Sequence, residues 1–282
     1  MRNSRSKTVI FLNGGFLAQE EAKIPALSPG FLQGFALFET MRSYNGTIVR
    51  LGRHLRRMAD SAKLLGLEPR YPGSRLRAVI GQAVGLSGSS DARVRIILSK
   101  GALGTDTLII AQKYDPPAAL KYRNGFKVCI SSLRQDESSF LSGLKTTSRV
   151  LYELSFNEAR TKGLDEAVIL NKSGYVAECS RSNIFFVQDK AIYTPSLVTG
   201  CLGGITRSIV FDLSRQHGLK IYEGKFIVQD VSGAQEAFLT NSLMGIMPLV
   251  SLEGRAVNGG AAGAITRSLM KDYRRLLIAH GK

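Results

Sequence analysis

The chain has 282 residues, of which 44% are hydrophobic, and its formal net charge is +16. This length can fill one large domain or two modest ones, and we expect two. No run of about 18 or more apolar residues is present to span a bilayer, and the N-terminal sequence MRNSRSK precedes only a short apolar stretch without a cleavage-site pattern. We therefore expect a soluble, cytoplasmic protein that does not enter the membrane.

The cysteines and histidines do not indicate a metal site or a disulfide framework. Cys129, Cys179 and Cys201 are odd in number, widely spaced and without a CxxC pair. The chain has only three histidines, so a metal cluster is not expected. We expect buried thiols in a reducing compartment and no bound metal.

The net charge of +16 would, taken alone, suggest nucleic acid or an anionic membrane as a partner. However, the basic residues are spread along the whole chain with Asp and Glu among them, and there is no polybasic tail or RNP-like aromatic signature. A basic field that attracts small anionic substrates, or a solubilising surface, is the favoured interpretation. A basic nucleic-acid-binding protein remains a remote alternative.

The first part of the chain predicts an α+β domain. Residues 8–17 read as two short strands about an Asn-Gly turn, and residues 38–51 repeat this device at Asn45-Gly46. Apolar residues three and four apart predict a helix over residues 52–65, ended by Gly66, and a second helix is expected near residues 73–85. Residues 91–101 and 107–114 alternate as strands do.

The segment Tyr114-Asp115-Pro116-Pro117 interrupts this pattern, because neither proline can donate a hydrogen bond to a sheet. We place the linker at residues 113–122. The predicted domains are therefore a small N-terminal domain of residues 1–117 and a larger C-terminal domain of residues 118–282.

Strands and helices also alternate in the second part of the chain. Strands are expected at residues 126–133, 166–171, 221–227, 237–241 and 247–250. VAECS (176–180) and NIFFV (183–187) read as a hairpin pair. Helices are expected at residues 148–162, 204–218 and 260–280, the first two ended by Gly163 and Gly218.

Several residues in this frame could carry chemistry, although each alone has an ordinary structural explanation. Gly203-Gly204-Ile205-Thr206 opens a helix, where free N–H groups and the helix dipole favour an anion such as phosphate. Thr240-Asn241-Ser242 ends a strand and suits a second phosphate contact, but it would equally suit a plain turn. Strand alternation places Glu178 on a face with Val176 and Ser180, which would point its carboxylate inward.

Two residues of the first long helix illustrate what periodicity alone can say. Arg57 lies well off the apolar stripe of that helix, which predicts a solvated arginine. His54 is expected to be a structural or surface histidine. Only information beyond helix periodicity could assign Arg57 to a site.

Six blocks in a fixed order resemble the class IV aminotransferase family, the fold type IV pyridoxal 5'-phosphate (PLP) enzymes. This family includes branched-chain and D-amino acid aminotransferases and 4-amino-4-deoxychorismate lyase. The blocks are GFLQGFALFETMR (30–42), HLRRMADSAKLLG (54–66), LKTTSR (144–149), VAECSRSNIFF (176–186), LGGITR (202–207) and LTNSLMGIMPL (239–249). The resemblance therefore covers nearly the whole chain.

The resemblance implies a role for particular residues. Lys145 would be the lysine that forms a Schiff base with PLP, which requires a neutral amine. Glu178 would pair with the pyridinium nitrogen, and Arg57 would bind the phosphate. The remaining phosphate contacts would be the amides of Ile205 and Thr206, with Asn241 and Ser242. The fold implied is a small α+β domain and a larger pseudo-barrel domain with the cofactor between them, commonly in a homodimer.

The motifs also bear on the reaction. LSKGALGTD (98–106) has Lys100 but no histidine, which disfavours the D-specific branch. LTNSLMGIMPL looks more like the lyases, although the LGGITR turn looks like that of the transaminases. We therefore expect 4-amino-4-deoxychorismate lyase, with a branched-chain or other class IV aminotransferase as the alternative. Candidate contacts for an anionic substrate are Arg42, Arg95 and Lys100.

Overall fold

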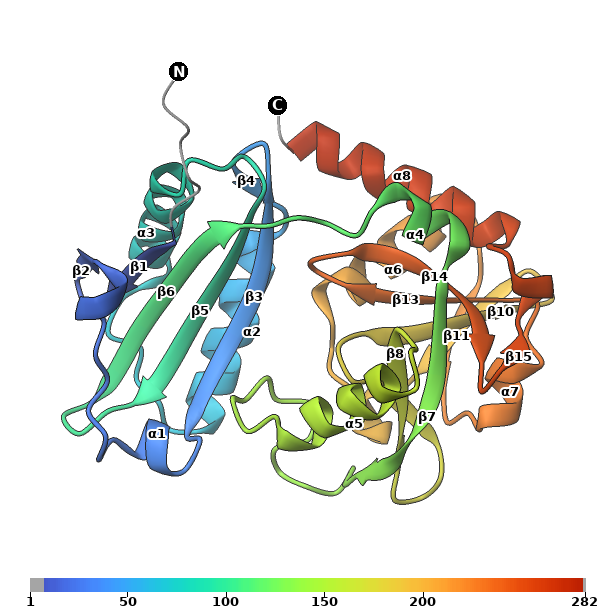
Figure 1. The fold of residues 1–282 in the computed structure, drawn as a ribbon, viewed down its shortest axis with the longest axis horizontal. Coiled ribbons are helices and arrows are strands. Elements are labelled where there is room, and N and C mark those ends of the chain that lie inside the picture. Colours follow the sequence, from blue (N-terminus) through green and yellow to red (C-terminus); the bar gives the residue numbers. More distant parts are fainter. Residues whose placement is uncertain (1–7, 281–282) are drawn as a thin grey trace. The chain divides into compact units, whose positions relative to one another are not determined.

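A computed structural model describes residues 8–280, which form two compact units (Figure 1). The N-terminal sequence MRNSRSK, in which no signal sequence is expected, lies outside these residues. Unit 1 contains the chain up to Asp115, the segment Leu144–Ser148 and the residues from Leu276 onward, and unit 2 contains Pro116–Gly143 and Arg149–Arg275. The chain first passes from unit 1 to unit 2 after Asp115, two residues before the expected boundary after residue 117. The sequence did not predict that Leu144–Ser148 and the residues from Leu276 onward belong to unit 1.

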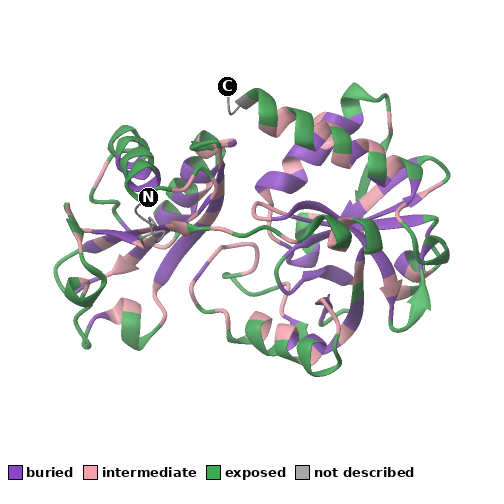
Figure 2. Ribbon diagram, turned by 45° about the horizontal axis from the view of Figure 1, so that its top comes forward, coloured by how far each residue is buried: buried purple, intermediate pink, exposed green. Residues whose placement is uncertain are grey.

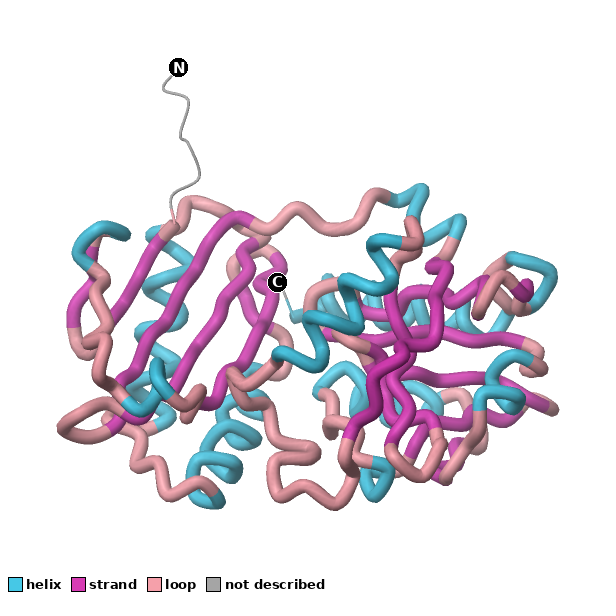
Figure 3. Tube along the Cα trace, turned by 60° about the horizontal axis from the view of Figure 1, so that its bottom comes forward, coloured by secondary structure: helices cyan, strands magenta, loops and turns pink. Residues whose placement is uncertain are grey.

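Unit 1 is built on a six-stranded sheet with the order β2-β1-β6-β5-β3-β4, whose strands run side by side in Figure 3. The paired strands are antiparallel throughout. Its strands are β1 (Val9–Leu12), β2 (Gly15–Leu17), β3 (Ala36–Tyr44), β4 (Thr47–Ile48), β5 (Ala92–Lys100) and β6 (Thr105–Lys113). The predicted Asn-Gly turn joins β3 to β4, with positive φ angles of 48° at Asn45 and 80° at Gly46, as a two-residue hairpin of this kind requires.

The two predicted helices of unit 1 pack against this sheet. They are α2 (Leu51–Leu64) and α3 (Gly73–Leu86). Leu55, Met58 and Ala62 of α2 are buried in one cluster with alternate residues of the strands, such as Met41 and Ile96. Because strand side chains alternate, the neighbouring residues Phe38, Arg42 and Arg95 stand on the opposite face of the sheet.

A backbone bridge joins the segment Leu144–Ser148 to the rest of unit 1. The N–H of Phe38 donates to the carbonyl of Lys145 at 2.9 Å, and the N–H of Thr147 donates to Ala36 at 2.9 Å. Leu37 and Thr146 form an isolated antiparallel bridge. Lys145 is therefore fixed beside β3, although its neighbours along the chain belong to unit 2.

Unit 2 contains a nine-stranded mixed sheet with the order β12-β11-β10-β13-β14-β7-β8-β9, and β15 pairs with β14. Its strands are β7 (Phe126–Gln135), β8 (Glu166–Asn171), β9 (Val176–Cys179), β10 (Asn183–Gln188), β11 (Ala191–Pro195), β12 (Ile221–Gly224), β13 (Glu236–Asn241), β14 (Gly245–Leu252) and β15 (Arg255–Ala256). The sheet curls, because the N–H of Val176 in β9, at one end of the order, donates to Phe226, just beyond β12 at the other end, at 2.8 Å. Buried positions gather on these strands (Figure 2).

The expected hairpin of residues 176–180 and 183–187 is wrong. β9 pairs with β8, whereas β10 pairs with β11 and β13. The hydroxyls of Ser180 and Ser182 donate to Glu166 at the start of β8, which keeps the connection against β8. Apart from Gln188, every residue of β9 and β10 is buried. The sequence therefore shows no alternation of polar and apolar residues that could indicate which strand pairs with which.

Helices complete both units. They are α1 (Pro29–Leu32), α4 (Ala119–Asn124), α5 (Val150–Thr161), α6 (Ile205–Gln216), α7 (Val228–Ser232) and α8 (Ala264–His280), with short 3-10 turns at Gln19–Glu21, Leu197–Thr199 and Asn258–Gly260. The three long helices predicted for the second part of the chain are all present, whereas α4 occupies the expected linker and α7 and β11 were not predicted. Within residues 8–280, no helix is both long and apolar enough to cross a membrane.

Gly245 provides a test of packing in unit 2. It has a φ of +74°, and an added Cβ would lie 2.5 Å from a ring carbon of Tyr273 in α8. We expect Gly245→Ala to cost about 1–2 kcal/mol in backbone strain and a further ~1–3 kcal/mol from overpacking, measured as the free energy of unfolding in denaturant. Gly163→Ala is the matched control, because Gly163 has a φ of +68° with no atom within 4 Å of the added Cβ. Equal losses in both variants would contradict the contact with Tyr273.

Candidate active site

A buried carboxylate organises the part of the site in unit 1. Glu39 lies on the helix-covered face of β3 and is only 1% exposed. Arg57 of α2 donates to both of its oxygens, from Nε at 2.7 Å and from Nη2 at 2.7 Å. Nδ1 of His54 lies 2.7 Å from Oε2 of the same carboxylate. Arg57 is thus held in a fork-like pair rather than extending into solvent.

These contacts set the charge of the cluster. Burial alone would raise the pKa of Glu39, but the hydrogen bond from His54 and the charge of Arg57 outweigh it and lower the pKa to about 2. Burial lowers the pKa of His54, and the charges of Arg57 and Lys145 lower it further, against the effect of Glu39. His54 is therefore a neutral donor to an ionised Glu39, and the expectation of a structural histidine agrees with this placement.

Lys145 lies over an aromatic ring on the other face of β3. Its Nζ is 4.7 Å from the centroid of the Phe38 ring, and the guanidinium carbon of Arg95 is 4.4 Å from the same centroid. Phe38 therefore brings the predicted Schiff-base lysine and one predicted substrate arginine together. Both cations gain from the negative face of the ring.

The other two predicted substrate residues of unit 1 are placed differently. Arg42 donates to Asp91 at 2.9 Å and contacts the rings of Tyr44, at 4.2 Å, and Tyr114, at 5.1 Å. These contacts tie Arg42 to Asp91 and to two aromatic rings of unit 1. Lys100 is the last residue of β5, where its N–H donates to Phe35, and it is half-buried.

In unit 2, Glu178 is held through both of its carboxylate oxygens. It lies in β9 opposite Ile169 of β8 and is 6% exposed. The hydroxyl of Tyr152 donates to Oε1 at 3.1 Å, and the N–H of Leu202 donates to Oε2 at 3.2 Å. Two donors on different oxygens fix the plane of the carboxylate.

The two predicted phosphate segments adjoin each other in unit 2. α6 begins at Ile205, and Gly204 at its N-cap has no side chain with which to satisfy the first N–H groups of the helix. Asn183 of β10 pairs with Thr240 of β13 and donates to the carbonyl of Leu202 at 2.8 Å. An added Cβ on Gly204 would lie 2.0 Å from Oδ1 of Asn183, so any other residue there would displace the Asn183 side chain. Asn183 thus links the start of α6 to the end of β13.

The side chain of Asn241 supports the protein itself. Its Nδ2 donates to the carbonyl of Arg181 at 3.1 Å, and its Oδ1 accepts from the N–H groups of Leu243, at 3.0 Å, and Met244, at 2.9 Å. This side chain closes the turn between β13 and β14. Ser242 lies in that turn and is half-buried.

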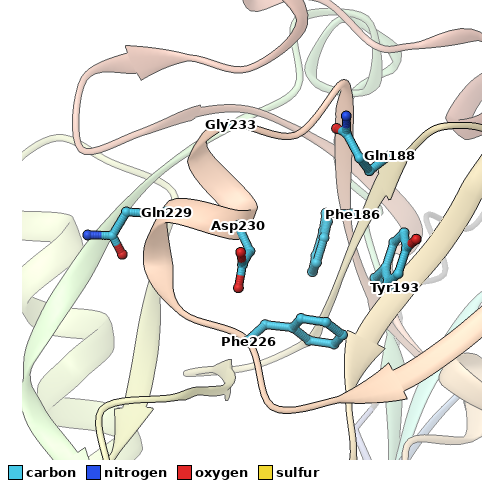
Figure 4. A pocket seen from close by; sticks show the side chains of 7 residues that line it. All are labelled: Phe186, Gln188, Tyr193, Phe226, Gln229, Asp230 and Gly233. Atoms are coloured by element: carbon cyan, nitrogen blue, oxygen red, sulfur yellow. The ribbon is translucent and has the colours of Figure 1, made fainter.

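A separate hollow in unit 2 contains none of the predicted site residues. It is lined by Phe186, Gln188, Tyr193, Phe226, Gln229, Asp230 and Gly233 (Figure 4). The ring of Phe226 stands nearly perpendicular to the stacked rings of Phe186 and Tyr193. The carboxylate of Asp230 accepts from the N–H of Ile227 at the start of α7. The hollow therefore lies where three packed aromatic rings meet the short helix α7.

Comparison with known proteins adds the family. Residues 36–252 match the family described as amino-transferase class IV, which is most of the chain. The chain belongs to the class IV aminotransferase family. This membership confirms the resemblance drawn from the six sequence blocks.

Three relatives are similar to this chain over nearly its whole length. The branched-chain-amino-acid aminotransferase of Pseudomonas aeruginosa is 32% identical over 94% of this chain and 91% of that protein. The aminodeoxychorismate lyase of Bacillus subtilis is 30% identical over 95% of this chain and 94% of that protein. The solved structure of the branched-chain aminotransferase from Thermoproteus uzoniensis with norvaline has a TM-score of 0.88 and 29% identity, over 96% of this chain and 95% of that chain. The expected α+β, fold type IV architecture is confirmed.

The class IV enzymes use PLP, and a similar solved branched-chain aminotransferase contains pyridoxamine 5'-phosphate, so this chain is a PLP-dependent aminotransferase or lyase. The residues present fit that cofactor. The start of α6 offers N–H groups without a side-chain cap, and the hydroxyl of Thr240 beside it is buried without a hydrogen-bond partner among residues 8–280. A phosphate would satisfy such donors. Glu178 supplies a fixed carboxylate and Lys145 an amine, the groups that the ring and aldehyde of PLP require.

Sequence reasoning missed Glu39, Phe38, Tyr152 and Asn183, which hold the predicted residues in place. Glu39 and Phe38 lie in the quoted block GFLQGFALFETMR, and Asn183 lies in VAECSRSNIFF. A glutamate within an otherwise apolar strand was the available signal for Glu39, because a carboxylate is seldom buried without a partner. Tyr152 carried no comparable signal.

The Glu39 cluster predicts a pH-dependent loss of stability. Glu39→Gln leaves Arg57 and His54 without their carboxylate, so we expect a loss of about 3–5 kcal/mol in the free energy of unfolding at neutral pH. The pKa of Glu39 is lowered from 4.5 to about 2, so its contribution is complete above pH 4.5 and is lost as the pH falls toward 2. The difference between wild type and variant should shrink over that range.

Denaturant unfolding at a series of pH values measures this difference. Asp60→Asn, at an exposed carboxylate on the same helix, is the control and should change stability by no more than about 0.5 kcal/mol. A difference between wild type and Glu39→Gln that stays constant as the pH falls would refute the ionised pair.

Proposed function

We propose that this chain is a PLP-dependent aminotransferase that acts on branched-chain amino acids. The relative from Pseudomonas aeruginosa carries the name of such an enzyme, and so does the similar structure from Thermoproteus uzoniensis, which was solved with norvaline. This proposal replaces the lyase that the motifs favoured and adopts the aminotransferase alternative.

The observation that carries this choice is the placement of Asn241. The expectation of a lyase depended on the asparagine in LTNSLMGIMPL. The structure gives this side chain a turn-closing role through Leu243, Met244 and the carbonyl of Arg181. An asparagine that a turn requires carries little information about substrate, so the motif no longer supports the lyase over the aminotransferase.

The proposed roles of the site residues follow from their surroundings. PLP, when bound, supplies a ring that accepts the electron pair left when the substrate loses its Cα proton. Lys145 would hold the cofactor covalently and then, once released by substrate, take up that proton at Nζ. Glu178 would keep a proton on the ring nitrogen. Arg57, the amides of Ile205 and Thr206, and the segment at Asn241 and Ser242 would bind the phosphate.

Phe38 and Arg95 suit an amino acid substrate. The guanidinium of Arg95 and the amine of Lys145 contact the same ring, so a carboxylate could pair with Arg95 while the reacting carbon lies near Lys145. Aminotransferases of branched-chain substrates handle one apolar and one acidic partner, which an aromatic ring beside an arginine can accommodate. Lys100 remains a proposed contact, whereas Arg42 is committed to Asp91.

The second candidate is aminodeoxychorismate lyase. The lyase of Bacillus subtilis is 30% identical over nearly all of both chains, close to the 32% of the aminotransferase relative. Sequence identity alone therefore does not separate the two reactions. Both reactions act on an anionic substrate and begin with removal of its Cα proton, so the assay must compare their products.

Parallel assays of one preparation test the proposed function. We expect the holoenzyme to transfer amino groups from branched-chain L-amino acids to 2-oxoglutarate and to release little or no 4-aminobenzoate from aminodeoxychorismate. Lys145→Ala should lose at least about three orders of magnitude in rate, as expected when a nucleophile and base is removed. Borohydride reduction should fix the cofactor to the peptide that contains Lys145. Efficient 4-aminobenzoate formation without transamination would transfer the assignment to the lyase.

We also propose that the enzyme is a homodimer, as relatives with this fold commonly are. Phe140, Leu141, Leu197 and Val198 are exposed apolar residues on two segments that adjoin, because the hydroxyl of Ser142 donates to the carbonyl of Gly200 at 3.2 Å. Such a patch is typical of a surface that another chain covers. We propose that a second copy of the chain covers it.

Val198→Glu tests the homodimer. Val198 is 68% exposed, so the change should leave the fold intact, but it would place a charge in the proposed interface. Light scattering should give twice the chain mass of 30.7 kDa for the wild type and a shift toward one chain mass for the variant. Leu120→Glu, at a residue 59% exposed on α4, should remain dimeric. A monomeric wild type would contradict the proposal.

A further inference from the structure

We propose that Tyr152 is a positioning residue that orients the Glu178 carboxylate for the ring nitrogen of PLP, and that Arg149 and Glu166 hold Tyr152 in place. This inference rests on the role of Glu178 in the proposed function. It concerns residues of unit 2 only, and their contacts form one connected chain from Glu166 to Glu178.

The direct contact is the hydrogen bond between Tyr152 and Glu178. The hydroxyl donates to Oε1 at 3.1 Å, while the N–H of Leu202 serves Oε2. Burial, and then the negative charge of Glu178, raises the pKa of Tyr152, so the hydroxyl keeps its proton and remains a donor. Without this donor, one oxygen of Glu178 would lose a contact that fixes the carboxylate plane.

Arg149 fixes the tyrosine ring. Its guanidinium carbon lies 4.1 Å from the centroid of the Tyr152 ring, and its Nη2 donates to the carbonyl of Ser180 at 2.8 Å. Ser180 follows Glu178 by two residues. The arginine therefore ties the start of α5, which carries Tyr152, to the connection that leaves β9, which carries Glu178.

Glu166 anchors that connection from the neighbouring strand. It is 2% exposed, and its carboxyl group accepts hydrogen bonds from the hydroxyls of Ser180 and Ser182 and from the N–H of Ala167. These hydrogen-bond donors are neutral groups, so the contacts hold geometry rather than neutralise a charge. The connection after β9 is thus fixed on both sides, by Glu166 and by Arg149.

The contacts imply that Tyr152 affects the Glu178 end of the site and not the phosphate contacts. In the proposed network Tyr152 acts through its hydrogen bond to Glu178. Its loss should therefore weaken the interaction of Glu178 with the ring nitrogen and leave the phosphate contacts unchanged. A ligand without the ring nitrogen should not sense the change.

The experiment compares two ligands on the apoprotein. Dissociation constants are measured by absorbance for PLP and for the analogue in which a C–H group replaces the ring nitrogen. We expect wild type to prefer PLP by at least about tenfold, as a hydrogen bond to a charged group provides. Tyr152→Phe should reduce this preference about three- to tenfold by weakening PLP binding alone. Tyr222→Phe, at an exposed tyrosine of β12, should leave the preference unchanged.

Four further variants separate the outcomes. Glu178→Gln should abolish the preference; if it does not, the assigned role of Glu178 fails, and this proposal with it. If Glu178→Gln abolishes the preference but Tyr152→Phe weakens both ligands equally, Tyr152 is merely structural and the positioning role alone is refuted. Arg149→Met should reduce the preference in the same direction and carries the test if Tyr152→Phe does not fold. Glu166→Gln, which can still accept from Ser180, should retain more of the preference than Glu166→Ala.

Discussion

The backbone pairing of residues 145–147 with β3 is the constraint on which the unit 1 part of the site depends. A lysine in an ordinary connection between β7 and α5 would have no fixed neighbours. Because the carbonyl of Lys145 accepts from Phe38 and the N–H of Thr147 donates to Ala36, the side chain of Lys145 emerges over Phe38. The same strand carries Glu39 on its opposite face, where it fixes Arg57. One strand thus sets the position of the lysine and of the arginine.

A second constraint is the demand that buried carboxylates place on their surroundings. Glu39 and Glu178 are each buried in a strand, where a lone charge would be costly. Each accepts from at least two other residues. His54 and Arg57 of α2 meet Glu39, whereas Tyr152 of α5 and Leu202 before α6 meet Glu178. Satisfying the carboxylates therefore also fixes the helices. Fold and site cannot be separated at these positions.

The sequence predicted the elements better than their pairing. Helical spacing in residues 52–65 and the Asn-Gly turn at residues 45–46 reflect local geometry, and both appear within a residue or two of the expected positions. The pairing of β9 with β8 instead depends on the contacts of Ser180 and Ser182 with Glu166, which lies at least 14 residues away along the chain. Periodicity carries no information on such contacts. For the same reason, Lys145 and Arg57 could be assigned only through the family resemblance, and the residues that hold them could not.

Glu39 and Glu166 show that partner type, rather than burial, decides the charge of a buried glutamate. Burial raises the pKa of Glu166 to about 7, because the groups that donate to it are serine hydroxyls and one N–H. Glu39 is similarly buried, yet its pKa falls to about 2, because a guanidinium and an imidazole face it. Glu178 accepts from a tyrosine hydroxyl and a backbone amide, and these two neutral donors orient its carboxylate. A protonated ring nitrogen would add a positive charge to this arrangement, and the Glu178 carboxylate would in turn favour the protonated form of that nitrogen.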